Sequence, residues 1–112
     1  MPAFALRIAF VFLLALVTGG TALAAPKRVV SMNACTDQMA MLIAGEGQLH
    51  SVSYLASDPG TSVLAAEAGR YAVNHGLAEE VFLMRPDLVL AGSYSTRATV
   101  ELLRRLGVHV EE

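Results

Sequence analysis

Four residues with polar or reactive side chains stand together between two apolar segments near the start of the chain. Asn33, Cys35, Thr36 and Asp37 offer an amide, the chain's single thiol, a hydroxyl and a carboxylate. Such a group could activate a nucleophile, hold a metal ion or form part of a binding cleft. The amide, hydroxyl and carboxylate could equally cap the start of a helix, which is their simplest use. The spacing of the other chemical groups has to decide among these alternatives.

The histidines do not complete a site around the thiol. The steps from Cys35 to His50, then to His75, then to His109 are 15, 25 and 34 residues, whereas structural zinc ligands come in close pairs. A nucleophilic thiol also needs a base within hydrogen-bond reach. We therefore expect no metal site made by the protein alone, and we interpret Cys35 as a small, partly buried packing residue.

The first 24 residues have the pattern of an export signal. Arg7 precedes ten apolar residues, Ile8 to Val17, and the segment ends in Ala22-Leu23-Ala24, as at a cleavage site. Ten helical residues span about 15 Å, half of a membrane's hydrocarbon core. We expect residues 1–24 to be a cleaved signal peptide and residues 25–112 to be a periplasmic protein.

The charge of the mature chain argues against a nucleic-acid partner. Without Arg7 it carries seven basic against ten acidic residues, whereas a nucleic-acid surface needs clustered basic charge. The sequence also lacks the G-x-G-x-x-G, Walker, C-x-x-C and G-x-S-x-G motifs of common enzyme classes. We therefore expect neither enzymatic activity nor a resident cofactor.

Strands and helices alternate along the mature chain, which predicts an α/β fold with a largely parallel sheet. Two of the helices have apolar residues at helical spacing: Met39, Leu42 and Ile43 in the first, and Val100, Leu103 and Leu106 in the last. The expected strands are 28–32, 49–55, 71–73, 87–91 and 108–110, and the expected helices are 36–44, 63–68, 77–84 and 96–106.

The loops that follow the strands are where a ligand should bind. In open parallel sheets, ligands lie beyond the carboxyl ends of the strands. Four polar loops follow predicted strands and should share this edge: residues 33–37, 54–58, 74–76 and 92–97. The polar group at Asn33 to Asp37 is one of the four, which favours a cleft over a catalytic centre.

Several ordered segments resemble a known family. They are PKRVVSMNACTDQ at 26–38, SVSYLASDP at 51–59, NHGLAEEVFLMRPDLVLAG at 74–92 and LLRRLGV at 102–108. Together they resemble the N-terminal lobe of the periplasmic solute-binding proteins that serve ABC importers for ferric siderophores, haem and cobalamin. The resemblance covers residues 26–110. It implies one half of a two-lobe protein, in which a long helix joins two α/β lobes and the ligand lies between them.

The resemblance implies a function without chemistry. The protein would capture a metal chelate as a monomer and deliver it to the transmembrane subunits of an ABC permease. The second lobe is absent, and the chain stops where the linking helix would begin, so we expect a fragment or a truncated gene product. The alternatives are an exported hydrolase or redox enzyme of unknown class, and a truncated lobe that binds nothing.

The expected site residues come from the four loops. A tyrosine after a strand can lie flat on a planar ligand or point into the core, His75 can be an axial ligand of haem iron or an exposed turn residue, and Arg97 can pair with an anionic ligand or remain solvated. The expected ligand-binding residues are Asn33, Tyr54, Asn74, His75, Tyr94 and Arg97.

The resemblance also implies carboxylates that dock on arginines of the permease. They are expected at the start of the helix after the last strand of the lobe. Here that position carries Arg97, and Glu101 follows one turn later. The carboxylates expected to dock are Glu79, Glu80 and Glu101.

Overall fold

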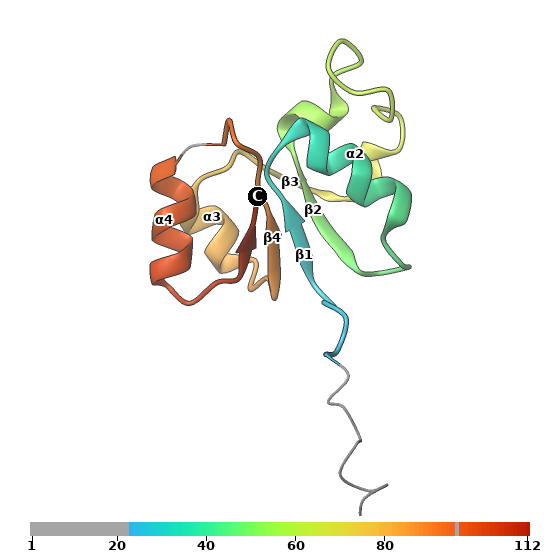
Figure 1. Cartoon of the computed structure of the whole chain (residues 1–112). Coiled ribbons are helices and arrows are strands. Elements are labelled where there is room, and N and C mark those ends of the chain that lie inside the picture. The colour runs from blue at the N-terminus through green and yellow to red at the C-terminus, as the bar shows by residue number, and fades with distance from the viewer. Residues whose placement is uncertain (1–22, 96) are drawn as a thin grey trace, which may run out of the picture.

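A five-stranded parallel sheet forms the centre of the molecule, as the alternation of elements predicted (Figure 1). The computed structural model describes residues 23–95 and 97–112, so most of the expected signal peptide lies outside the described residues. The sheet has the order β3-β2-β1-β4-β5, which places the first strand in the middle. The strands are β1 (Val29–Ser31), β2 (Leu49–Ser53), β3 (Ala72–Asn74), β4 (Leu88–Leu90) and β5 (Val110–Glu111).

Three α-helices and two 3-10 turns connect the strands. The three α-helices begin and end within two residues of their predicted bounds. The helix expected at 63–68 is wrong, because this segment forms turns. The backbone N–H of Glu67 donates to the Leu64 carbonyl at 3.0 Å, which is the i→i+3 bond of a turn and not the i→i+4 bond of an α-helix. The connections are α2 (Ala34–Ile43), η1 (Tyr54–Ser57), η2 (Ala68–Arg70), α3 (Ala78–Leu83) and α4 (Arg97–Arg105).

Helices α3 and α4 cover one face of the sheet. Val100 and Leu103 of α4 are buried, as their helical spacing predicted, but Leu106 of the same series is 47% exposed, because α4 ends at Arg105 and Leu106 lies beyond it. The apolar cluster on this face comprises Val30, Ala78, Val81, Val89, Ala91, Val100, Leu103 and Val110.

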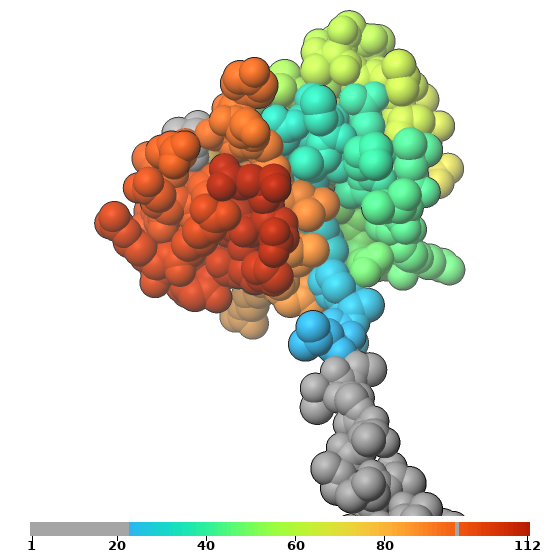
Figure 2. Space-filling model, in the orientation of Figure 1, coloured from blue at the N-terminus to red at the C-terminus, as the bar shows by residue number. Residues whose placement is uncertain are grey.

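Helix α2 and the two 3-10 turns cover the other face, over β1 and β2. Figure 2 shows the two layers from outside, with α4 in the orange-to-red half and α2 in the cyan-to-green half. The apolar cluster beneath α2 comprises Val29, Ala40, Leu49, Val52, Ala56 and Ala68.

Three large apolar residues of α2 do not point into this cluster. Met39, Leu42 and Ile43 are 58%, 68% and 76% exposed, while Asp37 and Ala40 are buried. Their spacing correctly predicted a helix but does not mark its buried side.

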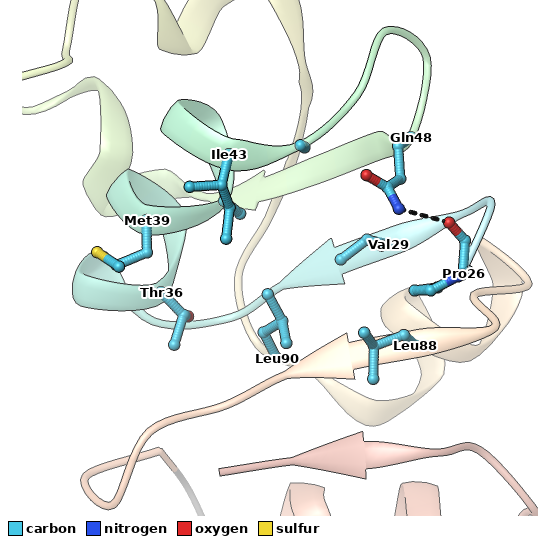
Figure 3. Close-up of a pocket in the computed structure, with 10 residues that line it drawn as sticks. Pro26, Val29, Thr36, Met39, Ile43, Gln48, Leu88 and Leu90 are labelled. Carbon is cyan, nitrogen blue, oxygen red and sulfur yellow. Dashed lines mark hydrogen bonds between the residues drawn. The ribbon is translucent and has the colours of Figure 1, made fainter. Parts of the chain in front are cut away.

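A groove of about 390 Å³ lies between α2 and strands β1 and β4 (Figure 3). It is lined by Pro26, Val29, Thr36, Met39, Ala40, Ile43, Ala44, Gln48, Leu88 and Leu90.

The amino end of the sheet is fastened by one carboxylate. Asp87 Oδ2 accepts the backbone N–H of Lys27 at 2.8 Å, and its Oδ1 accepts that of Arg28 at 2.9 Å. These bonds join the start of β4 to the start of β1 and lower the pKa of Asp87.

None of the helices described here has both the length and the apolar character that crossing a membrane requires.

Candidate functional site

The loops after β1 and β4 meet at the point where the strand order reverses. Strands β1 and β4 are neighbours, and the helices that follow them lie on opposite faces of the sheet. In open α/β sheets, this point is where ligands bind. Gly92 and Asn33 pack so closely here that a Cβ on Gly92 would lie 2.7 Å from Asn33 Nδ2. A side chain at position 92 would therefore have to displace the Asn33 amide, so Gly92 lets the two loops approach closely.

The polar group at the start of α2 mainly builds the helix end. Asn33 is the N-cap, and its Oδ1 accepts the backbone N–H of Cys35 at 2.9 Å. Thr36 Oγ1 donates to the Asn33 carbonyl at 3.0 Å and lies 2.7 Å from Ser31 Oγ. Cys35 is exposed in the first turn of α2, so our interpretation of a partly buried packing residue is wrong.

Asp37 is a buried carboxylate that ties α2 to the end of β2. Its Oδ1 accepts the backbone N–H of Ser53 at 3.1 Å, and its Oδ2 accepts the Ser53 hydroxyl at 2.5 Å. Burial raises the pKa of Asp37, and hydrogen bonds from Ser53 and Ser31 partly oppose the rise. This side chain is completely buried and therefore supports the loops without reaching a ligand.

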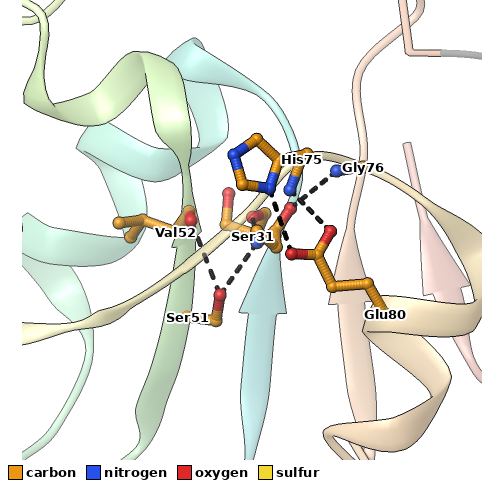
Figure 4. A network of polar contacts seen from close by, with 7 residues as sticks. Ser31, Ser51, Val52, His75, Gly76 and Glu80 are labelled. Atoms are coloured by element: carbon orange, nitrogen blue, oxygen red, sulfur yellow. Dashed lines mark hydrogen bonds and ion pairs between the residues drawn. The ribbon is translucent and has the colours of Figure 1, made fainter.

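Asn74 joins three strands beneath the loop that follows β3. Its Nδ2 donates to the Ser31 carbonyl at 2.8 Å and to Ser51 Oγ at 2.9 Å, and its Oδ1 accepts the backbone N–H of Gly76 at 3.1 Å (Figure 4). Gly76 has a φ of 71°, a conformation that favours glycine. Since Asn74 is fully buried, it shapes the loop and holds His75 in place from below.

His75 is held above the sheet by Glu80 and Tyr54. Glu80 Oε2 accepts the backbone N–H of His75 at 2.8 Å, and Glu80 Oε1 lies 3.1 Å from His75 Nδ1 (Figure 4). The ring of Tyr54, which follows β2, stacks on the imidazole with centroids 5.6 Å apart and planes at 20°. Two of the residues proposed from separate loops therefore form one unit at the carboxyl edge of the sheet.

Two further expected ligand residues follow β4, one in the loop and one at the start of α4. Tyr94 is 98% exposed, and Arg97 is exposed at the start of α4. Strand β1 separates this loop from β2 and β3, so Tyr94 and Arg97 lie across the edge from the Tyr54 and His75 pair. The four polar loops thus follow neighbouring parallel strands, as we expected.

The expected docking carboxylates differ in their surroundings. Glu79 and Glu101 are exposed on α3 and α4, while the Glu80 side chain is only 26% exposed and binds His75. Its role beside His75 was missed from the sequence, although an acidic residue in the first turn of a helix that follows Asn-His-Gly is a usable signal. Within residues 23–95 and 97–112, no three His, Cys, Asp or Glu side chains come together as a set that could hold a metal ion.

Several solved structures have a fold similar to that of this chain. No family model and no curated protein matches the sequence. A periplasmic heme-binding protein from Pseudomonas aeruginosa matches with a TM-score of 0.59 at 22% identity, over 78% of this chain and 31% of that one. A periplasmic vitamin B12-binding protein of Vibrio cholerae matches with a TM-score of 0.56 at 25% identity, over 77% and 33%.

A third solved structure extends the likeness. A possible iron-binding periplasmic solute-binding protein from Staphylococcus epidermidis matches with a TM-score of 0.57 at 18% identity, over 77% of this chain and 34% of that one. This chain spans about a third of the length of the three proteins. The fold is therefore that of a lobe of the two-lobe periplasmic binding proteins, as the sequence resemblance implied.

Proposed function

We propose that this chain is the ligand-capturing lobe of a periplasmic solute-binding protein that binds a metal chelate and delivers it to an ABC permease. The observation that carries the proposal is the exposed pair of rings, Tyr54 and His75, held at the carboxyl edge of the sheet by buried groups beneath them. Flat rings at such an edge suit a large planar or bulky chelate. The chelates named for the matched structures, heme and vitamin B12, are of this kind.

The chemistry of the edge favours binding over catalysis. The Ser53 hydroxyl and the Asp37 carboxylate form a hydroxyl–carboxylate pair, but both residues are buried and cannot meet a substrate. Among the described residues, Cys35 makes one hydrogen bond outside the backbone pattern of α2. It is the bond from the Cys35 backbone N–H to Asn33 Oδ1. An exported hydrolase that works through a covalent intermediate would need an exposed nucleophile with a base at hydrogen-bond distance.

The proposed site residues divide into two roles. Tyr54, His75, Tyr94 and Arg97 are exposed and would touch the chelate, whereas Asn33 and Asn74 would hold the loops that carry them. Glu79 and Glu101 are free to face a permease. We propose three classes of chelate, namely ferric siderophore, haem and cobalamin. The choice among them depends on a second lobe, which would supply the other half of the contacts.

Direct titration tests this proposal. Haem, cobalamin and a ferric trihydroxamate would each be titrated by absorbance or calorimetry against residues 25–112, and against a two-lobe protein in which this lobe is joined to the second lobe of a matched structure. We expect weak binding by the lone lobe, because one wall leaves the ligand largely wet, whereas small-molecule sites bury about 70–90% of a ligand. The two-lobe protein should bind at least one chelate more tightly by orders of magnitude.

A matched pair of variants locates the site. In the two-lobe protein, Tyr54→Ala should cost about 1–3 kcal/mol of binding free energy, the scale of losing an aromatic anchor. Leu106→Ala, which alters an exposed apolar residue just after α4, should leave binding unchanged. Failure of every chelate to bind the two-lobe protein, or unchanged affinity in Tyr54→Ala, would contradict the proposal.

A further inference from the structure

The ends of α3 and α4 lie together at the amino end of the sheet, opposite the loops of the proposed binding edge. The strands are parallel, and each of these helices ends a few residues before the next strand begins, α3 before β4 and α4 before β5. The segment that leads into β1 leaves the lobe at the same end (Figure 1). A hollow of about 400 Å³ lies here, lined by Phe82, Leu83, Arg85, Pro86 and Val108.

Large apolar side chains are exposed around this hollow. Leu83 is 78% exposed and Phe82 is 43% exposed at the end of α3, and Leu106, just after α4, is 47% exposed. The backbone N–H of Val108 donates to the Leu103 carbonyl at 3.0 Å, which folds the segment after α4 back against the helix end and beside the hollow. Exposed apolar groups that gather within a charged rim are typical of protein or membrane interaction sites.

The charged side chains around the hollow are basic. Arg85 and Arg105 are exposed, and among the described residues neither side chain takes part in an ion pair. The segments 82–86 and 102–109, which form the two helix ends, contain no acidic residue. Asp87 follows the first segment, but its two carboxylate oxygens accept backbone amides of the segment before β1. An anionic partner would therefore meet unpaired cations at this end.

Arg85 stands where the end of a helix usually has glycine. It follows Met84, the C-cap of α3, and its φ is 52°. A residue in this left-handed conformation after a helix is most often glycine, because a Cβ is strained there. Unusual backbone conformations at a surface are a reason to look for a function. Here the conformation places a cation at the edge of an apolar hollow.

The form of this surface favours a lipid membrane over a protein partner. A stable protein interface buries about 800 Å² on each partner, which is more than a few side chains around one hollow can supply. A membrane surface needs only that cations attract the anionic headgroups and that apolar side chains enter the interface. The processed chain has seven basic and ten acidic residues, so net charge would repel such a surface and attraction requires a local patch.

We infer that the amino end of this lobe docks on an anionic lipid surface. The docking residues are Phe82, Leu83, Arg85, Arg105 and Leu106. In this orientation the carboxyl edge of the sheet, at the other end of the strands, faces the solution. The inference goes beyond the proposed function and does not depend on which ligand, if any, the carboxyl edge binds.

Sedimentation with vesicles tests the inference. The processed chain, residues 25–112, is used because an apolar leader would bind lipid by itself. The vesicles are phosphatidylcholine alone, or phosphatidylcholine and phosphatidylglycerol in equal parts. Wild type should bind only the anionic vesicles. Binding should fall at least about fivefold when salt is raised from about 0.1 M to about 1 M, because the Debye length shrinks from about 10 Å to about 3 Å.

Matched variants locate the contact. Leu83→Ser should weaken binding about tenfold, because its apolar side chain no longer enters the interface, whereas Ile43→Ser, at a residue with nearly the same exposure on α2, should bind as wild type. Arg85→Asn should weaken binding about fivefold, and asparagine tolerates the left-handed conformation. Arg85→Lys should retain binding. Arg70→Asn, which removes an exposed cation on η2, should have no effect.

Three results would overturn the inference, and circular dichroism of each variant checks that the fold is intact. The first is that wild type binds neither kind of vesicle, or both equally. The second is that Ile43→Ser or Arg70→Asn weakens binding as much as Leu83→Ser or Arg85→Asn. The third is that wild type binds immobilised polyglutamate but not the anionic vesicles, with a loss in Arg85→Asn, which would assign this surface to an acidic protein.

Discussion

The two faces of the sheet are held together by different interactions. On the face of α3 and α4, apolar side chains such as Val100 and Leu103 are buried and the charged residues of α4 point outward. On the face of α2, the buried side of the helix carries Asp37 and Ala40, while Met39 and Ile43 remain exposed. Apolar packing thus dominates one face, whereas the other combines the smaller apolar cluster beneath α2 with buried hydrogen bonds at the loop ends. The predictions below test this contrast.

The largest effect is expected at Leu103, in the packed face. Leu103→Ala should lower the free energy of unfolding by about 2–5 kcal/mol, because it removes a fully buried side chain and leaves a cavity. The neighbouring substitution Leu102→Ala, at a residue that is 40% exposed on the same helix, controls for helix propensity and should cost much less. Urea denaturation followed by circular dichroism measures both. Equal losses would show that α4 is not the packed layer described here.

A smaller effect is expected at Asp37, in the hydrogen-bonded face. Asp37→Ala should cost about 1–3 kcal/mol at neutral pH, because the buried backbone N–H of Ser53 loses its acceptor. Asp37→Asn keeps an acceptor oxygen and should cost less. The same urea titrations give both values. A cost below that of Leu102→Ala would mean that the hydrogen bonds do not secure this face.

The pH dependence of Asp37 sharpens this test. Burial raises its pKa above the ordinary value of 3.8, so the stability contributed by its proton is complete below that value and is lost as pH rises through the folded pKa. The unfolding free energy of wild type relative to Asp37→Asn should therefore fall as pH increases from acid to neutral. Asp87 should give the opposite slope against Asp87→Asn, because backbone hydrogen bonds from Lys27 and Arg28 lower its pKa.

The smallest effect is expected at Ile43, on the exposed side of α2. Ile43→Ser should change the unfolding free energy by less than about 0.5 kcal/mol, as for other surface positions, because its side chain is already 76% exposed. Urea denaturation at two protein concentrations is the measurement. A loss above about 1 kcal/mol, or a dependence on concentration, would show that Ile43 is covered in solution.

Because alternating strands and helices favour a parallel sheet, the sequence predicted the strands and their parallel direction, but not their order in the sheet. It could not identify the inner side of α2, since the apolar residues at helical spacing, including Met39 and Ile43, lie outside, whereas the buried residues are Asp37 and Ala40. Tyr54 and His75 were found as separate residues after strands. Their stacking depends on the adjacency of β2 and β3, which emerges only from the strand order.

The close contact between Asn33 and Gly92 also lay beyond sequence reasoning. It joins two loops far apart in the chain, and a glycine in a loop has many simpler explanations. The expected helix at 63–68 failed locally, because i→i+3 bonds such as that from the Glu67 N–H to the Leu64 carbonyl form turns there. The contact between Asn33 and Gly92, by contrast, depends on segments far apart in the chain.

The central place of β1 has a consequence for the order in which the chain folds. The bond from Gln48 to the Pro26 carbonyl, beside the β1–β2 pair, closes 22 residues, whereas the bond from Arg28 to Asp87, beside the β1–β4 pair, closes 59. The longer closure costs about 1 kcal/mol more in chain entropy. Strand β1 is the first to leave the ribosome, yet one of its edges stays open until β4 arrives, and an unpaired apolar edge is where chains aggregate. The nascent lobe is therefore most vulnerable during the interval that separates its first strand from its fourth.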